Sequence, residues 1–532
     1  METDRLIDVV IAGAGPTGSA LAIDLTRRGL KVRLLERGGQ AFGGSRAKGV
    51  QPRSLEVLHD LGVSDEIVDG GSLYPKLGVH LGPFTVPWRM FTENEASDGV
   101  PYPNTWLIPQ FRIDRALHAR LQELGGAVEF GKELLDFNQD SDTVTCRVST
   151  SDGTEEIRAR YLVGADGGSS TVRKHLGIDF LGSTDEEDRI LIVDAAVSGL
   201  RRDRWHIWPG ARGRFVGACP LPHSDLFQWM IRLSPEEMPP SDLNAIVERL
   251  QSRIRNPQIR LHGIQWQSVF RPNIRLAENY RRGRVFVAGD AAHVHTPAGA
   301  QGLNTGLQDA YNLGWKLAQV LAGAPSGLLD TYETERQPIA EGVLGLSTRK
   351  YQGIAKLDPS AMRRGKDEQQ ILLTYHGGPL APPGGERTRT LRVGDRAPDA
   401  VLKAVAQGNP VRLFDLYRGS HFTAVACGEQ AAQACGRLPW PSSGAALKRV
   451  VVGATTASVD AVLTDPLRSF ENLYGVTGDT LLLIRPDGYI GHIATRDMLA
   501  TTGAAARAMA PPGDGRGQTA PRFSPVAQEP AQ

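Results

Sequence analysis

The chain opens with a pattern of apolar runs and helix-length segments that is typical of a parallel sheet. Residues 9–12 form a continuous apolar run, which predicts a buried strand. A helix is predicted over 19–28 and ends at Gly29, and a second strand is predicted over 31–36. Because strand, helix and strand in this order make a βαβ unit, we expect the chain to begin with a Rossmann-like α/β domain.

Two later segments repeat the apolar strand and end in a polar turn. The first is predicted from 161 to 165 and ends in Asp166-Gly167, with a short helix after it. The second is predicted over 285–288 and ends in Gly289-Asp290, and a long helix follows from about 303 to 321. Both segments could add parallel strands to the first sheet.

Alternating patterns predict antiparallel sheets between these segments. A small sheet is expected over 128–159, and aromatic, proline and glycine residues mix over 71–104. A three-strand meander is predicted over 204–208, 214–220 and 227–233. The middle of the chain is therefore expected to hold a β-sheet domain that interrupts the first domain.

Composition is that of an ordinary globular chain. The 532 residues are 41% hydrophobic and 22% charged, with a formal net charge of +1, so nothing points to nucleic acid or an acidic membrane surface. The four cysteines form no C-x-x-C pair, which argues against a disulfide framework, a zinc site or an iron–sulfur cluster. No apolar stretch has the length of a membrane span, and the chain enters a predicted strand almost at once. We therefore expect a cytoplasmic protein without a signal peptide.

A glycine-rich turn joins the first strand to the first helix. Residues 13–18 read Gly-Ala-Gly-Pro-Thr-Gly, a G-x-G-x-x-G motif, and Glu36 closes the second strand. Gly13 permits the tight turn, Gly15 lets the backbone approach a pyrophosphate, and Gly18 lets helix and strand pack closely. The N–H groups at the helix N-terminus favour a bound anion. Glu36 can accept from both ribose hydroxyls and would repel a 2′-phosphate, so the motif suits FAD or NAD.

Polar residues in other loops could complete a nucleotide site. Arg46 follows Glu36 in a glycine-rich loop and could reach a pyrophosphate or a flavin edge, and a solvated loop arginine fits the same spacing. Asp290 can accept from a ribityl hydroxyl, and the N-terminus of the helix that contains Asn304 can stabilise negative charge on a reduced flavin. Arg53 is a candidate cation near the flavin, with the same alternative as Arg46.

Two histidines, His293 and His295, follow Asp290 closely. They could be metal ligands or bases, but no further acid or cysteine lies at ligand spacing, so we expect no metal. We interpret both histidines as structural.

Together the motifs resemble one family. The sequence contains, in order, Gly13–Gly18, Ser45-Arg46-Ala47, Gln110-x-x-x-Asp114, Asp166-Gly167, Gly289-Asp290 and Tyr332-x-x-Glu335-Arg-x-Pro338. Over about residues 5–350 it is similar to the class A FAD-dependent aromatic hydroxylases, the p-hydroxybenzoate hydroxylase-like flavoprotein monooxygenases. Asp114 stands where many relatives carry Glu, which leaves its contact open. Residues 394–499 resemble the thioredoxin-like C-terminal domain of the subgroup with phenol hydroxylase, and the length resembles bacterial enzymes that tailor aromatic polyketides.

The resemblance implies an α/β chain with three folded domains. A Rossmann-like FAD-binding domain of the GR2 type is expected to be discontinuous, over 1–72, 107–184 and 276–390. A β-sheet substrate-binding domain is expected over 73–106 and 185–275. A thioredoxin-like domain over 391–503 lacks C-x-x-C, which indicates a packing role. The Pro-, Gly- and Ala-rich end predicts a disordered tail over 504–532.

The resemblance also implies roles for individual residues. Non-covalent FAD is expected to bind through its ADP half and pyrophosphate at Gly13, Gly15, Pro16, Thr17, Gly18, Glu36, Arg37, Arg46 and Gln110. Asp166 belongs to a stretch that contacts both FAD and NADPH, and Asp290 binds the ribityl chain and pyrophosphate. The isoalloxazine is expected beside Pro297, Gly299, Gly302, Leu303 and Asn304. The candidate catalytic residues are Arg53, Pro297 and Asn304.

The implied reaction follows from the cofactor. NADPH or NADH would reduce FAD and visit it transiently, because the sequence contains no second G-x-G-x-x-G. Reduced flavin would then add O₂ to give a C4a-(hydro)peroxide. The protonated peroxide hydroxylates a phenol ring, and its anion attacks a ketone in Baeyer–Villiger insertion. We expect a monooxygenase that hydroxylates a polycyclic, polyketide-type aromatic in antibiotic or secondary-metabolite biosynthesis, as a monomer or homodimer. Baeyer–Villiger insertion and a non-catalytic flavin-binding protein remain alternatives.

Aromatic residues of the middle segments are the candidates for the substrate pocket. A flat polycyclic substrate needs broad apolar walls and a few polar anchors. The candidate walls and anchors are Trp88, Phe91, Trp205, His206 and Trp208. Packing of the same side chains within the sheet is the alternative interpretation.

Overall fold

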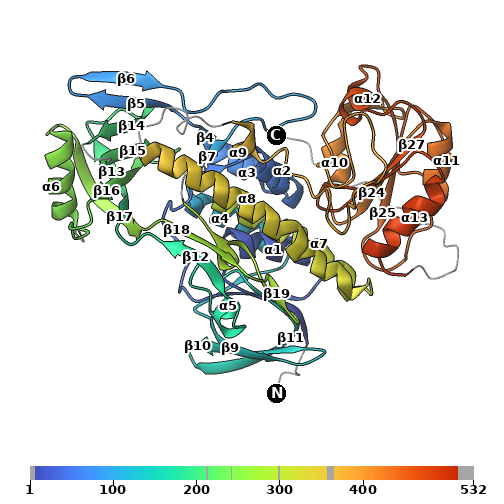
Figure 1. Ribbon diagram of the computed structural model, residues 1–532, viewed down its shortest axis with the longest axis horizontal. Coiled ribbons are helices and arrows are strands. Elements are labelled where there is room, and N and C mark those ends of the chain that lie inside the picture. Colours follow the sequence, from blue (N-terminus) through green and yellow to red (C-terminus); the bar gives the residue numbers. More distant parts are fainter. Residues whose placement is uncertain (1–5, 211–213, 241, 297–299, 356–364, 513–532) are drawn as a thin grey trace.

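Three sheets organise the chain into three regions. The computed structural model describes residues 6–210, 214–240, 242–296, 300–355 and 365–512. A central α/β domain lies between a large, mainly antiparallel sheet on one side and the C-terminal domain on the other (Figure 1). The long helix α8 (Asp330–Ala355) crosses the middle of the same view. The chain segments that precede and follow this sheet in the sequence belong to the central domain.

The central domain is built on a mainly parallel sheet with strand order β19-β20-β11-β1-β2-β8. The five strands from β20 to β8 run parallel, and Val9, Val10 and Ile11 in β1 are fully buried. Continuous apolar runs form these strands because both faces of the sheet are covered. Their bounds are β1 Ile7–Ala12, β2 Val32–Glu36, β8 Val128–Phe130, β11 Gly153–Gly164, β19 Arg281–Arg282 and β20 Val285–Val287.

Strand β11 is one continuous strand where the sequence predicts two. Its first half pairs antiparallel with β10 (Val144–Thr150), which pairs in turn with β9 (Glu133–Gln139). Its second half pairs parallel with β1, from Ala159 to Gly164. The same strand therefore belongs to the small meander and to the parallel sheet, and it leads directly to Asp166.

Helices α1 (Pro16–Arg27) and α7 (Gly302–Leu321) pack closely against one another. A Cβ atom on Gly306 would lie 2.3 Å from Oγ1 of Thr17, and one on Gly314 would lie 2.2 Å from Oδ2 of Asp24. Glycine is therefore required at this contact. The other helices of the region are α2 Pro52–Leu61, α3 Ser64–Asp69, α4 Gln110–Glu123, α5 Thr171–His175, α9 Lys366–Gln369, η2 Gly289–Ala291 and η3 Ser326–Leu329.

The mainly antiparallel region, in which only β14 and β5 pair parallel, has strand order β17-β13-β16-β15-β14-β5-β6. We call it the substrate sheet after the role that the sequence leads us to expect. Helix α6 (Leu243–Ile254) covers one face, where Ile246 and Leu250 pack in one hydrophobic cluster with Phe227 and Trp229. The predicted meander corresponds to β14–β16. The bounds are β5 Lys76–Leu81, β6 Phe84–Trp88, β13 Arg189–Ser198, β14 Arg204–Pro209, β15 Phe215–Pro220, β16 Leu226–Leu233 and β17 Arg260–Phe270.

Two three-stranded sheets connect the central domain to its surroundings. One has the order β3-β7-β4 and the other β12-β18-β21. Their bounds are β3 Gly49–Val50, β4 Ser72–Leu73, β7 Trp106–Leu107, β12 Phe180–Thr184, β18 Asn273–Ala277 and β21 His293–Val294. The first sheet brings the glycine-rich loop after β2 beside the segment that enters α4.

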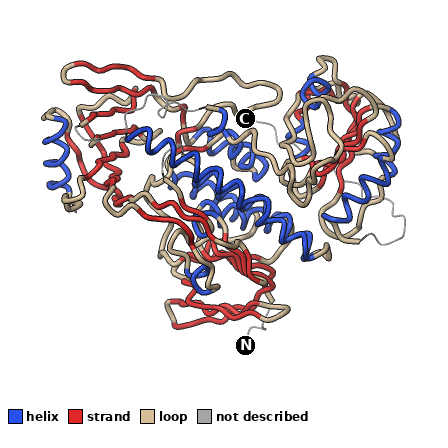
Figure 2. The backbone as a smooth tube through the Cα atoms, in the orientation of Figure 1, coloured by secondary structure: helices blue, strands red, loops and turns tan. Residues whose placement is uncertain are grey.

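The C-terminal domain is a sheet with helices on both faces, seen as the separate cluster of strands in Figure 2. Helix α13 (Met498–Met509) passes residue 503, where we expected a disordered tail to begin, because Ala506 and Met509 are buried in its core. The other bounds are β22 Val401–Ala404, β23 Pro410–Arg412, β24 Phe422–Cys427, β25 Leu447–Val452, β26 Ala461–Thr464, β27 Thr480–Ile484, β28 Ile490–Ala494, α10 Leu413–Tyr417, α11 Glu429–Arg437 and α12 Ser469–Tyr474. Among the described helices, none is both long and apolar enough to cross a membrane.

Candidate active site

The three motif glycines of the first turn have different structural requirements. Gly13 has φ +101°, and a Cβ atom there would lie 2.4 Å from the carbonyl oxygen of Ala165. A Cβ on Gly18 would lie 2.0 Å from the carbonyl oxygen of Gly13. A Cβ on Gly15, in contrast, meets no atom within 4 Å. Gly13 and Gly18 are thus required by the chain's own backbone, whereas Gly15 borders open space.

The N-terminus of α1 faces this open space without a side-chain cap. The helix begins at Pro16, and its N-cap residue is Gly15, which has no side chain to accept a hydrogen bond from the first turn. The first N–H groups of a helix have no partner within the helix, so they are available to an anion. Glu36 lies beside the turn, where its carboxylate accepts the N–H groups of Ala14 (3.0 Å) and Gly38 (2.9 Å). Arg37 is exposed.

Helix α4 contributes a buried acid near Glu36. Asp114 is 2% exposed, and its Oδ1 atom has no hydrogen-bond partner. Burial raises the pKa of Asp114 to about 7, with a smaller contribution from the charge of Glu36. Gln110 is 3.4 Å from Asp114, and its backbone N–H bonds the carbonyl of Ala47 at 2.9 Å. Gln110 therefore fixes the loop that carries Arg46.

Arg46 and Asp290 meet across the site from distant loops. Their side chains lie 3.7 Å apart and are 63% and 42% exposed. The turn that carries Asp290 packs on α1, because a Cβ on Gly289 would lie 2.5 Å from Oγ1 of Thr17. The two charged residues predicted to bind pyrophosphate thus lie together near the N-terminus of α1, which fits a dinucleotide.

The start of α7 adjoins the same turn. A Cβ on Gly302 would lie 3.2 Å from Nε2 of His295 and 3.8 Å from Oδ1 of Asp290. That Nε2 atom is buried without a partner, and burial lowers the pKa of His295. Leu303 is half-buried beside Gly302. The predicted positions Pro297 and Gly299 lie outside the described residues.

The side chain of Asn304 is engaged by backbone groups on both sides of the site. The fully buried amide accepts the N–H of Gln51 (2.7 Å) and donates to the carbonyl oxygens of Gly49 (2.9 Å) and Ala300 (2.6 Å). The predicted catalytic role of this side chain is not supported, because the amide joins α7 to β3. Asn304 acts as a positioning residue for the backbone of the site.

The side chain of Arg53 is held by residues of α2 and of the C-terminal domain. Its guanidinium is buried, pairs with Glu56 (2.9 Å), donates to the carbonyl of Asp487 (2.8 Å) and lies 4.9 Å from the centroid of the Tyr489 ring. These groups belong to α2 and the C-terminal domain. These contacts do not support the expectation of a cation near the flavin for Arg53, whose side chain joins two domains.

Asp166 ends the strand segment as predicted and caps the next helix. Its Oδ2 atom accepts the N–H groups of Thr171 (2.7 Å) and Val172 (3.2 Å), and Ser170 accepts from Arg173 (2.9 Å). The Oδ1 atom of Asp166 is buried without a partner. One carboxylate oxygen is thus used structurally, and the other is free for a ligand.

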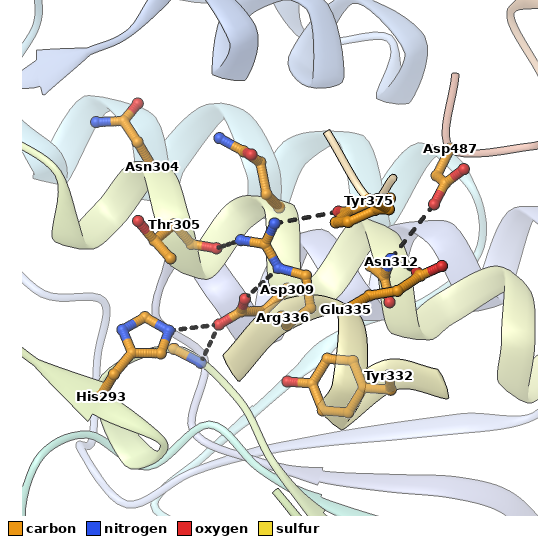
Figure 3. A network of polar contacts seen from close by, with 12 residues as sticks. His293, Asn304, Thr305, Asp309, Asn312, Tyr332, Glu335, Arg336, Tyr375 and Asp487 are labelled. Atoms are coloured by element: carbon orange, nitrogen blue, oxygen red, sulfur yellow. Dashed lines mark hydrogen bonds and ion pairs between the residues drawn. The ribbon is translucent and has the colours of Figure 1, made fainter. Parts of the chain in front are cut away.

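A buried network that the sequence analysis missed supports the Gly289-Asp290 turn (Figure 3). Asp309 on α7 accepts from the Gly289 N–H (3.1 Å) and lies 2.7 Å from Nε2 of His293 and 2.8 Å from Nε of Arg336. Arg336 also donates to the hydroxyl of Tyr375 at 3.1 Å. Burial alone would raise the pKa of Asp309, but the charges of His293 and Arg336 hold it below its ordinary value. Arg336 belongs to the Tyr332–Pro338 motif, and this motif was the feature of the sequence that could have indicated the network.

The candidate pocket residues divide between the two faces of the substrate sheet. The register places Trp205 opposite Leu77 and Leu77 opposite Trp88, so the two tryptophans share a face. His206 and Trp208 lie on the other face, where Trp208 stacks on Trp229 at 6.1 Å. His206 and Trp208 therefore pack within the sheet, and the prediction that they line the pocket is not supported. Because successive side chains of a strand point to opposite faces, Trp205 lies on one face of β14 and His206 and Trp208 lie on the other.

The face with Trp205 is turned toward the glycine-rich loop. The backbone N–H and the hydroxyl of Ser45 both donate to Asp194 of β13, at 2.6 and 2.5 Å. Gln228 of β16 donates to the Ser45 hydroxyl at 2.5 Å. Loop and sheet are therefore held together beside the predicted flavin position.

A cavity of about 630 Å³ opens at the β5–β6 edge of the sheet, where Lys76, Thr85 and Arg204 lie on the face opposite Trp205. Phe91, one of the candidate pocket residues, lines it, and its ring lies 4.7 Å from that of Tyr74. Other lining residues include Lys76, Thr85, Thr105 and Arg204. The volume lies in the range typical of small-molecule sites. Within the described residues, no group of three or more His, Cys, Asp or Glu side chains is placed to hold a metal ion.

Comparison with known proteins adds an independent line of evidence. The family described as FAD binding domain matches residues 6–347. A flavin-dependent monooxygenase of Mycobacteroides abscessus is 43% identical over 492 residues, which cover 91% of this chain and 96% of that protein. The anhydrotetracycline monooxygenase of Streptomyces rimosus is 34% identical over 518 residues, which cover 91% and 94%.

Solved structures with the same arrangement include two hydroxylases. The anhydrotetracycline hydroxylase OxyS from Streptomyces rimosus is 31% identical, with a TM-score of 0.73 and coverage of 96% of this chain and 100% of that chain. Aklavinone-11 hydroxylase, in a ternary complex with FAD and aklavinone, is 26% identical, with a TM-score of 0.77 and coverage of 95% and 99%. The matches extend through the C-terminal domain.

Proposed function

Since the chain belongs to the FAD binding domain family and is an FAD-dependent aromatic monooxygenase, we propose that it hydroxylates a flat polycyclic substrate of the polyketide type. NADPH or NADH would supply the electrons. In the balanced reaction, substrate, O₂, NAD(P)H and one proton give hydroxylated substrate, NAD(P)⁺ and water. The relatives named for anhydrotetracycline and aklavinone support this substrate class.

The residues around the first turn fit FAD. Open space lies in front of Gly15, the α1 N-terminus is uncapped, and Arg46 and Asp290 meet beside it. The N–H groups of α1 and Arg46 would hold the pyrophosphate, Glu36 the ribose and Asp290 the ribityl chain. When bound, FAD supplies the electron transfer and oxygen activation of the reaction.

The chain's own contribution is binding, orientation and exclusion of water. Asn304 and Asp309 fix the backbone on either side of the site, because one holds β3 and the other holds Gly289. The loop that carries Ser45 closes against the substrate sheet through Asp194. A substrate held between loop and sheet would be shielded from water there.

One observation carries the substrate assignment. Trp88 and Trp205 share the face of the sheet turned toward the glycine-rich loop, and the Trp205 ring lies 6.1 Å from that of Tyr74, which lines the cavity with Phe91. This group of four aromatic side chains suits a flat ring system better than a small aliphatic substrate.

The test is product identification after incubation with a panel of polycyclic phenols and quinones. Hydroxylation predicts a new phenol in the NMR spectrum. A lactone that opens in mild base would instead identify Baeyer–Villiger insertion, because both reactions add one oxygen atom and mass alone does not separate them. Bound FAD without substrate-dependent O₂ consumption would indicate a flavin-binding protein of another kind and contradict the proposal.

A further inference from the structure

Lys48 occupies a fixed position between the glycine-rich loop and the substrate sheet. Its carbonyl oxygen accepts the N–H of Ile108 and the hydroxyl of Tyr74, both at 3.0 Å, which anchors its backbone. Its Nζ atom lies 4.6 Å from the centroid of the Trp205 ring and donates to Oε1 of Gln228. The ammonium group therefore points toward the sheet face that we assign to the substrate.

Lys48 donates to Gln228 and makes no direct ion pair with a carboxylate of the described residues. Asp194 is the carboxylate that faces it, but both Asp194 oxygens accept from Ser45. Cys219 of β15 is the other titratable group that faces it. Burial lowers the pKa of Lys48, and a bound anion would offset that desolvation.

Aromatic rings connect Lys48 to the cavity. The Phe91 ring lies 4.7 Å from the Tyr74 ring, and Tyr74 lies 6.1 Å from Trp205, over which Lys48 is placed. Phe91 and Tyr74 line the cavity of about 630 Å³. A flat molecule that enters along these rings would bring an edge to the ammonium group.

We propose that Lys48 binds the ionised hydroxyl of a flat phenolic or enolic substrate and so selects acidic polycyclic phenols. The inference rests on the proposed function and specifies its substrate class. The hydroxyl proton passes to solvent on binding, and the ammonium keeps its charge beside the oxyanion and the Trp205 ring. An ionised ring oxygen also raises the electron density of the ring that is to be hydroxylated.

Spectral titration of a bound phenol tests the assignment. The probe is alizarin, a tricyclic phenol whose absorbance shifts to longer wavelength on ionisation, away from the flavin band. The FAD-loaded enzyme should lower the pKa of bound alizarin by about 1 to 3 units relative to free alizarin. In Lys48→Met this shift should disappear and Kd at neutral pH should rise about tenfold or more, whereas Lys48→Arg should retain most of both.

Two controls separate the possible outcomes. Lys403→Met changes an exposed lysine of the C-terminal domain and should leave the titration unchanged. An O-methylated alizarin, which cannot ionise at the blocked positions, should bind Lys48→Met and the parent equally. An unchanged alizarin pKa in Lys48→Met, loss of FAD from this variant alone, or failure of the parent to bind alizarin would each overturn the inference. If Lys48 binds ionised alizarin but no polycyclic phenol stimulates O₂ consumption, the proposed function fails and the binding role of Lys48 stands.

Discussion

The Nε2 atom of His293 lies 2.7 Å from Oδ2 of Asp309, and both side chains are buried. The same carboxylate oxygen accepts the Gly289 N–H, so His293 acts through Asp309 on the turn that carries Asp290. This arrangement favours a structural role for His293, whereas the partly exposed Asp290 remains available to a ligand.

Asp290→Ala should therefore weaken FAD binding more than His293→Ala or His295→Ala. Removal of a charge-assisted hydrogen bond costs about 1.5–3 kcal/mol, or roughly 10- to 150-fold in Kd. His293→Ala should instead lower Tm, because it leaves Asp309 less well paired. Flavin fluorescence titration and thermal unfolding measure the two effects. Loss of turnover in a folded, FAD-loaded His293→Ala enzyme would reveal a role in proton transfer.

Gly15→Val should fold and lose FAD. Gly15 has φ −68° and ψ −179°, an extended conformation open to any residue, and a Cβ there meets no protein atom within 4 Å. The branched side chain would occupy the space assigned to pyrophosphate, so we expect at least an approximately tenfold rise in Kd. The A450/A280 absorbance ratio reports FAD content, and Gly327→Val, another position with open space, is the matched control. Full occupancy in Gly15→Val would place the nucleotide elsewhere.

Trp205 and Trp208 provide a matched pair within one strand. Trp205→Ala should weaken substrate binding about tenfold through the loss of roughly 1.5 kcal/mol of stacking, with FAD content unchanged. Trp208→Ala should lower Tm instead, because Trp208 stacks on His80 (4.5 Å) and Trp229 (6.1 Å). Substrate titration and thermal unfolding of both variants check this, and the reverse pattern would assign the pocket to the opposite face.

The local motifs of the nucleotide site could be predicted from sequence, but the directions of side chains could not. Gly13, Gly18 and Glu36 act within one βαβ unit, so their spacing determines their geometry. Arg53 depends on Asp487, which is 434 positions away and in another domain, and nothing near Arg53 indicates that contact. Which face of β14 borders the site depends on which side of the sheet the central domain covers.

Charge pairs that join domains could not be predicted from the sequence either. Arg485 of the C-terminal domain pairs with Glu335 of α8 at 2.6 Å, and both side chains are buried. Glu335 lies in a motif quoted from the sequence, but its partner does not. Sequence alone therefore identifies the motif without its role in holding the domains together.

Arg485→Met should destabilise this junction strongly. The change leaves Glu335 and Asp487 with an incomplete set of partners in a buried site, which costs about 3–5 kcal/mol. We expect a lower Tm and faster proteolysis between the domains. Arg468→Met, which removes an exposed pair with Glu471, should change Tm little.

The same junction predicts a dependence on acid. Burial opposes ionisation of Glu335, but Arg485 and Lys316 outweigh it and hold its pKa at about 2. Because this pKa is lower than in the unfolded chain, the stabilisation is present above about pH 4.5 and is lost as pH falls toward 2. Tm measured across this window should fall less steeply for Arg485→Met than for the parent, and equal slopes would argue against the pair.

Incorporation of isotopically labelled oxygen gas tests the central claim most directly. The FAD-loaded enzyme is incubated with NADPH, a polycyclic phenol and labelled O₂, and the product is analysed by mass spectrometry and NMR. Our account predicts one labelled oxygen atom in a new ring hydroxyl, with no label taken up when the label is in water. Labelled O₂ that yields only hydrogen peroxide, or a product whose new oxygen comes from water, would contradict it.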